Sequence, residues 1–366
     1  MSTQLCRELG MEVPVFAFAH SRDVVAAVSR AGGCGVLGIA GLTAEQIEAD
    51  LSWIDGELDG APYGVDVLFP SITVEESAER PLEGLISTEH RRFVEDLLES
   101  HGVPQLSDVG PLLTRPPGRE HAVSQVQQAL EHPVRIVASA MGAPPAELVD
   151  MVHERGAVVA GVAGSTRHAE RQRDAGVDVI VAQGHEAGGH TGEVTTMVLV
   201  PEVVDAVAPL PVLAAGGIAC GRQLAAALTL GAQGAWTGSV WLTTDEANTE
   251  PVLTQKFLAA TSRDTVRSRS TSGKPARQLR SAWTEAWDGD DSPGALPMPL
   301  QGTLAAEARE RIRRAAPNHP GAADLITYYV GQVVGSMNEL KSVSQVMSEM
   351  IEECADVLAR TSSSLR

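Results

Sequence analysis

The sequence predicts an α/β protein whose parallel strands close into a (β/α)8 barrel with a helical C-terminal addition. Two observations carry this prediction. Between Val13 and Gly238, short apolar runs rich in β-branched residues alternate with segments of helical periodicity, the pattern of repeated β-α units. We count eight such strands, and this number favours a closed barrel over an open doubly wound sheet.

The first units set the pattern. A strand ending at His20 leads into a helix that begins at Ser21, which we expect to cap it, and Gly32-Gly33 ends this helix before a second strand. Tyr63–Phe69 reads as the third strand, with Asp66 set among apolar neighbours. This aspartate is either a partner for a ligand N–H or a solvated residue at the strand end, and the pattern leaves both open.

The remaining strands and helices follow in strict alternation after a weakly patterned, acidic stretch from residue 71 to 131. We expect that stretch to form surface helices and a long connection rather than barrel wall. The expected elements are then strand Val134–Ser139, helix Pro144–Arg155, strand Ala157–Gly161, helix Arg167–Ala175, strand Val177–Ala182, helix Pro201–Val207, strand Pro211–Ala214, helix Gly221–Leu230 and strand Gly234–Gly238. We predict a barrel over residues 1–243, a lid over 244–314 on the substrate side, and C-terminal helices over 315–366 that pack on the barrel.

Composition limits the partners. The formal net charge is −19 and the pI is about 4.9, so no general basic field is present for nucleic acid or an anionic membrane. The four cysteines are far apart and suggest neither a zinc site nor a disulfide framework. No run reaches the roughly 18 apolar residues of a membrane span. We expect a soluble, cytoplasmic protein that binds a small molecule and no metal.

The stretch Val179–Val194, V-I-V-A-Q-G-H-E-A-G-G-H-T-G-E-V, is the strongest candidate for a site. A buried strand here empties into a loop at the carboxyl end of the barrel, where ligands bind in such folds. Its glycines allow a flat ligand to approach the backbone, and His185, Glu186 and His190 offer hydrogen bonds or proton transfer. The alternative is a tight glycine-rich turn with solvated polar tips.

A phosphate site is predicted beyond the last two strands. Ala214–Ile218 leaves one of them and Trp236–Ser239 leaves the other, and loops in these positions commonly hold a phosphate through backbone N–H groups. Ser239 adds a hydroxyl. The spacing does not choose between FMN, a nucleotide and a sugar phosphate as the ligand, and two ordinary helix-starting turns remain the alternative.

These motifs resemble those of the nitronate monooxygenase family, formerly called 2-nitropropane dioxygenases, which are FMN-dependent (β/α)8 enzymes. The matching text is A-Q-G-H-E-A-G-G-H-T-G from Ala182, A-A-G-G-I from Ala214, W-T-G-S from Trp236 and S-G-K-P-A-R from Ser272. The resemblance implies that FMN is bound by Asp66, Gln183, Gly188, Gly189, Gly216, Gly217, Trp236, Thr237, Gly238 and Ser239. Asp66 stands where many members have an asparagine, and a carboxylate cannot donate a hydrogen bond unless it is protonated.

Two histidines are the catalytic candidates that the resemblance implies. His168 looks like the catalytic base of the family, although a histidine at a helix start is more often a cap or a surface residue. His190 occupies a loop position shared with related FMN-dependent enoyl-acyl-carrier-protein reductases. The strand end Phe16–His20 lacks the methionine common in the family.

The expected activity is oxidation of alkyl nitronates, and of nitroalkanes after proton removal, with O₂ to carbonyl compounds and nitrite, in a possible homodimer. Two alternatives stay open. One is an FMN-dependent NAD(P)H reductase of an enoyl thioester or a quinone, and the other is a barrel that binds a phosphate ligand without chemistry.

Overall fold

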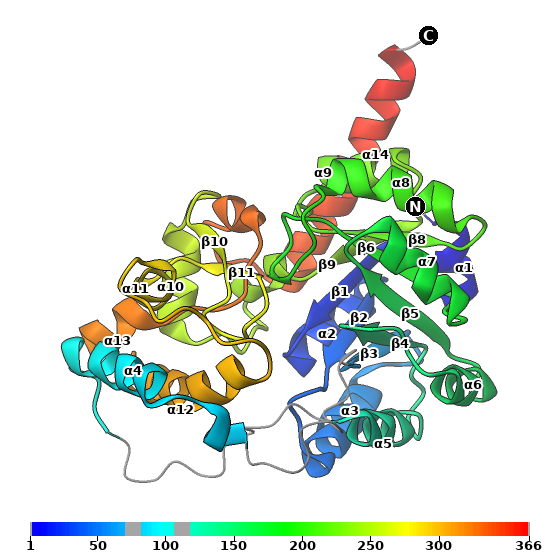
Figure 1. Cartoon of the computed structure of the whole chain (residues 1–366). Coiled ribbons are helices and arrows are strands. Elements are labelled where there is room, and N and C mark those ends of the chain that lie inside the picture. The colour runs from blue at the N-terminus through cyan, green and yellow to red at the C-terminus, as the bar shows by residue number, and fades with distance from the viewer. Residues whose placement is uncertain (1, 70–81, 106–117, 365–366) are drawn as a thin grey trace.

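The computed structural model describes residues 2–69, 82–105 and 118–364. Within them, eight parallel strands close into a barrel, each hydrogen-bonded to the next in register (Figure 1). They are β1 (Val15–Ala19), β2 (Cys34–Gly38), β3 (Tyr63–Leu68), β4 (Ile136–Ala140), β5 (Val158–Ala163), β6 (Val179–Gln183), β8 (Val212–Ala215) and β9 (Gly234–Thr237). The predicted barrel and all eight strands are confirmed, with boundaries that differ by one or two residues.

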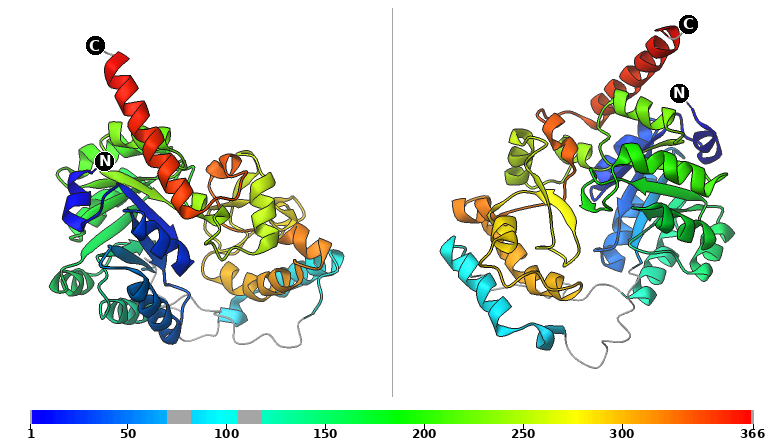
Figure 2. Two further views of the ribbon diagram at one scale, coloured as in Figure 1. Left: turned by 180° about the vertical axis from the view of Figure 1, so that it is seen from behind. Right: turned by 45° about the horizontal axis from the view of Figure 1, so that its top comes forward.

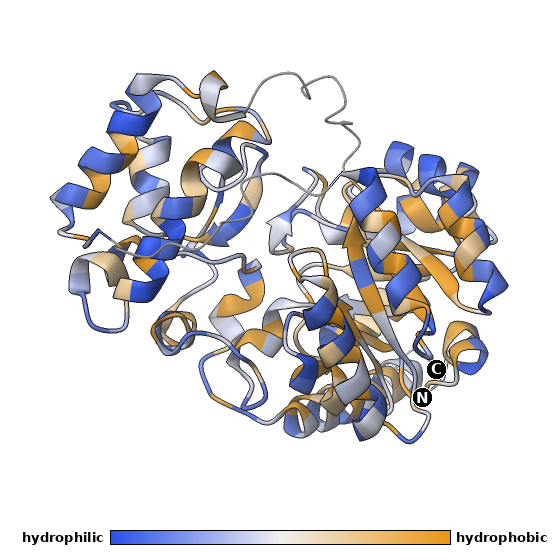
Figure 3. Ribbon diagram, turned by 90° about the horizontal axis from the view of Figure 1, so that it is seen from below, coloured by the Kyte–Doolittle hydropathy of each residue, from blue (hydrophilic) through white to orange (hydrophobic). Residues whose placement is uncertain are grey.

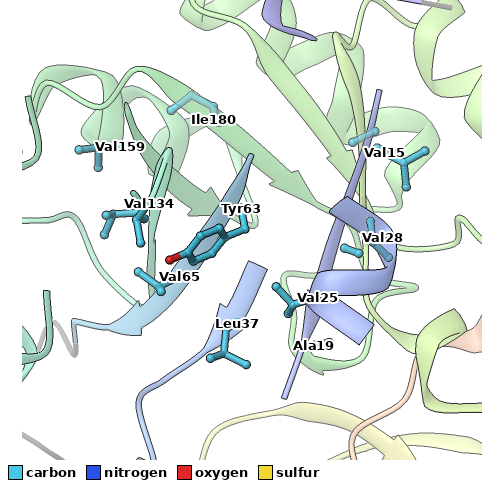
Figure 4. Packing of buried hydrophobic residues seen from close by; sticks show 14 of the residues in the cluster. Val15, Ala19, Val25, Val28, Leu37, Tyr63, Val65, Val134, Val159 and Ile180 are labelled. Atoms are coloured by element: carbon cyan, nitrogen blue, oxygen red, sulfur yellow. The ribbon is translucent and has the colours of Figure 1, made fainter. Parts of the chain in front are cut away.

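A layer of helices covers the outside of the barrel. It contains α2 (Arg22–Arg30), α3 (Ala44–Glu57), α5 (Arg119–Ala129), α6 (Ala146–Glu154), α7 (Thr166–Asp174), α8 (Thr196–Val207), α9 (Gly221–Thr229) and α14 (Val343–Ser364). Outward-facing strand residues such as Val65 and Ile180 are fully buried against this layer (Figure 4). Seen along another axis, the apolar colour is concentrated in the strands and the inner helix faces (Figure 3).

A second apolar cluster fills the inside of the barrel and is closed at the amino end by α1 (Gln4–Leu9). Leu5 and Leu9 of this helix pack with Phe16 and Val36, which face inward from β1 and β2. The hydroxyl of Thr3, the N-cap of α1, donates to the carbonyl oxygen of Gln233 at 2.7 Å. One end of the barrel is therefore plugged, and access remains at the carboxyl ends of the strands.

A smaller unit with its own apolar core lies beside the barrel (Figures 1 and 2). It contains η2 (Leu82–Leu85), α4 (Thr88–Ser100), α10 (Pro251–Ala259), β10 (Thr265–Ser268), β11 (Ala276–Leu279), α11 (Ala282–Asp288), α12 (Leu300–Ala315), α13 (Pro320–Leu325) and η4 (Gln332–Ser336). Its strands join the barrel loop after β6 through a short strand, β7 (Gly189–His190). We call this unit the lid.

Several expectations need correction. The stretch 71–131, as far as it is described, divides: α4 packs in the lid, whereas α5 buries Val126 and Ala129 against the barrel and is part of its helical layer. The C-terminal segment divides as well. Its helix α14 packs on α9, but α13 lies in the lid because Leu325 is buried among lid residues. The boundaries at 243/244 and 314/315 stay predictions.

Two local predictions also differ from the structure. Helix α8 begins at Thr196 and contains Pro201, so the proline does not mark its first turn. The burial of Leu199 and Val200 on the barrel supports the earlier start. Ser21 precedes α2 but makes no side-chain capping bond, because its hydroxyl donates instead to the carbonyl oxygen of Glu246 at 2.7 Å.

Candidate functional site

The loop after β6 folds tightly against the start of α8. Gly184 is pressed on Thr196, so that a methyl group at position 184 would lie 2.5 Å from the Thr196 backbone nitrogen. Both the N–H and the hydroxyl of Thr196 donate to Glu186 Oε2 at 2.9 Å. Glu186, one of the polar residues considered for chemistry, thus has a structural partner at the helix start.

The lid holds the rest of this loop in place. Gly189 and His190 pair with Arg277 and Ala276 of β11, and the Arg277 Nε donates to the carbonyl oxygen of His185 at 3.0 Å. Arg267 of β10 donates to the carbonyl oxygen of Thr191 at 3.2 Å. Two guanidinium groups of the lid therefore hold the backbone of the loop that carries His185 and His190.

His190 is held by a residue of the same lid. Its Nε2 lies 2.8 Å from the Ser272 hydroxyl, and its ring lies 5.8 Å from that of Tyr329. Burial, and secondly the nearby charge of Lys274, lowers the pKa of His190 to about 4. The ring is therefore neutral at pH 7 and offers one donor and one acceptor, not a positive charge.

Lys274 is a half-buried cation beside this histidine. Its backbone N–H donates to Ser272 Oγ at 3.3 Å, which fixes the turn that carries it. Within the described part of the chain, its ammonium group has neither an ion pair nor a hydrogen bond to a side chain or carbonyl. The site therefore contains an uncompensated positive charge next to a neutral imidazole.

His168 occupies the first turn of α7, which starts directly after β5. Its backbone N–H donates to the hydroxyl of the N-cap Ser165 at 3.3 Å, and its side chain is exposed. Gly164, the residue before Ser165, contacts Gly192 through the backbone of both residues. The structure thus brings the chain segments that carry His168 and His190 together at the mouth, because each histidine lies within a few residues of this contact.

The predicted phosphate turns lie on the same side of the barrel. Gly216 and Gly217 have φ angles of 97° and 74°, a left-handed conformation that favours glycine, and Gly216 packs against the backbone of Ala187. Beyond β9, Gly238 precedes η3 (Ser239–Thr243), and the Ser239 hydroxyl accepts a hydrogen bond from Gly331 N–H at 2.8 Å.

Two other residues of the predicted cofactor set have internal partners. The Thr237 hydroxyl donates to the carbonyl oxygen of Phe16 and accepts from Trp241 Nε1. Trp236 faces the barrel interior, where its ring stacks on Phe16 with a centroid distance of 6.4 Å. The side chains of Thr237 and Trp236 are therefore engaged in contacts within the barrel. These two residues would contact a ligand through their backbone groups.

Sequence reasoning missed one part of the site. The segment Val330–Gly331, just before η4, packs so closely on Gly188 that a methyl group there would lie 2.9 Å from the Gly331 nitrogen. Gln332 N–H also donates to the carbonyl oxygen of Glu186 at 2.9 Å. The only signal in the sequence was the glycine of Y-Y-V-G-Q, which has no distinctive spacing.

Asp66 and Gln183 test whether the interior suits a polar planar ligand. Both face inward by the alternation of their strands, and neither side chain has a hydrogen-bond partner among the described residues. Asp66 is only 6% exposed, and burial raises its pKa to about 8. Buried polar groups are nearly always paired, so Asp66 fits the role of a ligand contact, and the half-buried Gln183 offers an amide from the same interior. Together with the glycine turns, they suit a flat ligand that carries a phosphate.

Among residues 2–69, 82–105 and 118–364, no helix is long and apolar enough to cross a membrane. In this protein a lid is joined to the loops at the carboxyl ends of the barrel strands, and polar groups without partners among the described residues face the same region. This architecture is typical of (β/α)8-barrel enzymes that bind a ligand at this face. The comparisons with known proteins narrow this class.

The model of the nitronate monooxygenase family matches residues 12–353. The chain is 53% identical to a Mycobacterium tuberculosis protein described as a putative monooxygenase, over 98% of both, and 30% identical to a probable nitronate monooxygenase of Bacillus subtilis, over 94% of this chain and 95% of the other. The chain belongs to the nitronate monooxygenase family, and it is an oxidoreductase of a family for which flavin dependence is expected.

Solved structures agree with this membership. Nitroalkane oxidase from Streptomyces ansochromogenes matches with a TM-score of 0.79 and 26% identity, over 96% of this chain and 98% of that one. FabK from Thermotoga maritima matches with a TM-score of 0.73 and 27% identity, over 99% of both chains. Both solved structures therefore share the fold of this chain over nearly its whole length.

Proposed function

We propose that this protein is an FMN-dependent nitronate monooxygenase that oxidises alkyl nitronates with O₂ to carbonyl compounds and nitrite. The observation that carries the proposal is Lys274, which has no side-chain partner among the described residues, beside a neutral His190 at the loop that leaves β6. A nitronate is an anion, so the positive charge of Lys274 attracts it, whereas a neutral nitroalkane gains little from this charge.

FMN, when bound, supplies the electron transfer between substrate and oxygen. Gln183 and Asp66 would contact its ring from inside the barrel, and the turns at Gly216-Gly217 and Gly238-Ser239 would hold its phosphate. The remaining steps fall to this chain's own side chains. Neutral His190 donates one hydrogen bond to a nitro oxygen, and the Ser272 hydroxyl fixes the orientation of its ring.

His168 serves as the base when the substrate is a neutral nitroalkane. The acidic C–H must lose its proton before oxidation, and a ring nitrogen of the exposed imidazole can accept it. The contact between Gly164 and Gly192 keeps the base and the nitro-binding histidine on adjoining loops. For a nitronate this step is unnecessary, because the proton is already absent.

The proposal is tested by the visible spectrum of the FMN-loaded protein without oxygen, before and after addition of an alkyl nitronate. We expect the flavin bands to change with nitronate alone and to recover on admission of air, with nitrite formed. NADH and NADPH are tried in parallel samples. Reduction by a nicotinamide with no response to nitronate would move the assignment to the reductase alternative.

Replacing Lys274 by methionine should raise KM for an alkyl nitronate about tenfold, the effect of losing about 1.4 kcal/mol of attraction. KM for the corresponding neutral nitroalkane should stay unchanged. The measurement is steady-state oxygen consumption at two salt concentrations, because screening reduces the difference between the wild-type protein and the variant. Arg263→Met, which removes an exposed cation of the same lid, is the matched control. Equal KM changes for both substrates would contradict the charge argument.

A further inference from the structure

The carboxyl group of Asp66 is buried and has no hydrogen-bond partner among the described residues. Its side chain projects from the middle of β3 into the barrel, and its neighbours in register are Gly38 of β2 and Ala138 of β4. Neither neighbour has a side-chain donor or acceptor. Only 6% of Asp66 is exposed, and no described residue donates a hydrogen bond to its carboxyl group. An ionised carboxylate in such a place has little contact with water and no donor among the described residues, which is unfavourable.

Among the described residues, the charged and titratable groups around Asp66 do not supply a partner for its carboxyl group. From β2, the Cys34 thiol faces the same interior, and burial raises its pKa to about 12, so it is neutral. At the end of β1, the His20 ring packs on Phe18 and its Nδ1 lies 3.4 Å from the Gly38 carbonyl oxygen. Desolvation of this ring lowers the pKa of His20, although part of the residue is solvent-exposed. The inward residues of β4, Ile136 and Ala138, are apolar.

We infer that Asp66 is held as a neutral carboxylic acid and donates its O–H to the flavin ring, as an amide N–H would. The inference rests on the proposed FMN dependence and deepens it. A protonated carboxyl has one donor and one acceptor, which matches the donor that an asparagine supplies. At a pH above its pKa, the Asp66 carboxyl group is an anion inside the barrel and has no hydrogen to donate. It then repels an electron-rich edge of the ligand.

The protein without flavin provides a first test. Burial raises the pKa of Asp66 to about 8, whereas an aspartate in the unfolded chain titrates near about 4. Between these values the folded state holds a proton that the unfolded state has lost, so the stability of the folded state falls as pH rises through this window. Asp66→Asn removes this dependence. We therefore expect the Tm of Asp66→Asn, relative to that of the wild type, to increase from pH 5 to pH 8 and then level off. A Tm difference that does not change with pH would overturn the neutral acid.

Flavin affinity provides the second test. Wild type should bind FMN about tenfold more weakly at pH 9 than at pH 7, while Asp66→Asn should bind it equally at both, apart from changes shared by all variants. Asp66→Leu, which has similar bulk and no donor, should bind weakly at both pH values. The readout is the equilibrium change in flavin absorbance or fluorescence, which requires no turnover.

The outcomes are distinguishable from failure of the proposed function. If wild type and Asp66→Asn show the same ratio of affinities between pH 7 and pH 9, the hydrogen bond to flavin is wrong. If wild type binds no FMN at any pH, the proposed function fails, and the thermal comparison still decides whether Asp66 is neutral. If Asp66→Asn does not fold, the pH dependence of FMN binding by wild type alone decides, since a constant affinity above pH 7 contradicts the inference.

Discussion

Replacement of His168 by asparagine is expected to lower kcat/KM for a neutral nitroalkane by about 100- to 1,000-fold, within the range of general base catalysis. Activity on the corresponding nitronate should change less than threefold, because the nitronate has already lost the proton. Asparagine keeps the helix-compatible size of the residue and removes only the base. The measurement is oxygen consumption with each substrate form, added from separate stocks to avoid slow interconversion.

A matched control for this variant exists in the same barrel. His121 occupies the third position of α5, just as His168 occupies the third position of α7, and both side chains are exposed. His121→Asn should leave both activities unchanged. If His168→Asn retained full activity on the neutral nitroalkane, the base assignment would be wrong.

The barrel could be predicted because each strand has its own local pattern. β-branched runs such as those of β5 and β6, separated by a helical segment, define β-α units without reference to the rest of the chain. The glycines of the site could be located for the same reason, since a strand end and its loop are adjacent in sequence. Features that depend on neighbouring residues alone could therefore be predicted from the sequence.

The surroundings of His190 could not be predicted, because they come from distant segments. Ser272, Lys274 and Tyr329 reach it only through the pairing of β7 with β11 and the packing of the segment before η4. A two-residue strand has too few positions to show an alternating pattern. The two interpretations of Asp66, a ligand contact or a solvated residue at the strand end, could not be separated for the same reason. The distinction depends on the strand register that places Gly38 and Ala138 beside Asp66.

The contact between Gly164 and Gly192 explains why the two histidine segments depend on each other, and it leads to the second large effect. A methyl group at position 192 would overlap the carbonyl oxygen of Gly164 and lie 3.0 Å from its carbonyl carbon. Since the neighbour is backbone, it cannot move aside by a rotamer change. Gly192→Ala should therefore separate the two loops, cost about 1–3 kcal/mol of stability and lower the turnover of a neutral nitroalkane, which requires both histidines, about 100-fold.

Gly189→Ala separates this steric effect from a change in backbone conformation. Gly189 has a φ angle of 75°, so alanine is strained there by about 1 kcal/mol, but no atom lies within 4 Å of the added methyl group. We expect a small loss of Tm and nearly full turnover of the neutral nitroalkane. Glycine is required at position 192 by a steric contact and at position 189 by a positive φ angle. Tm and kcat/KM measured together therefore distinguish a strained loop from a displaced one. Equal turnover by both variants would mean that the Gly164 contact does not position the histidines for catalysis.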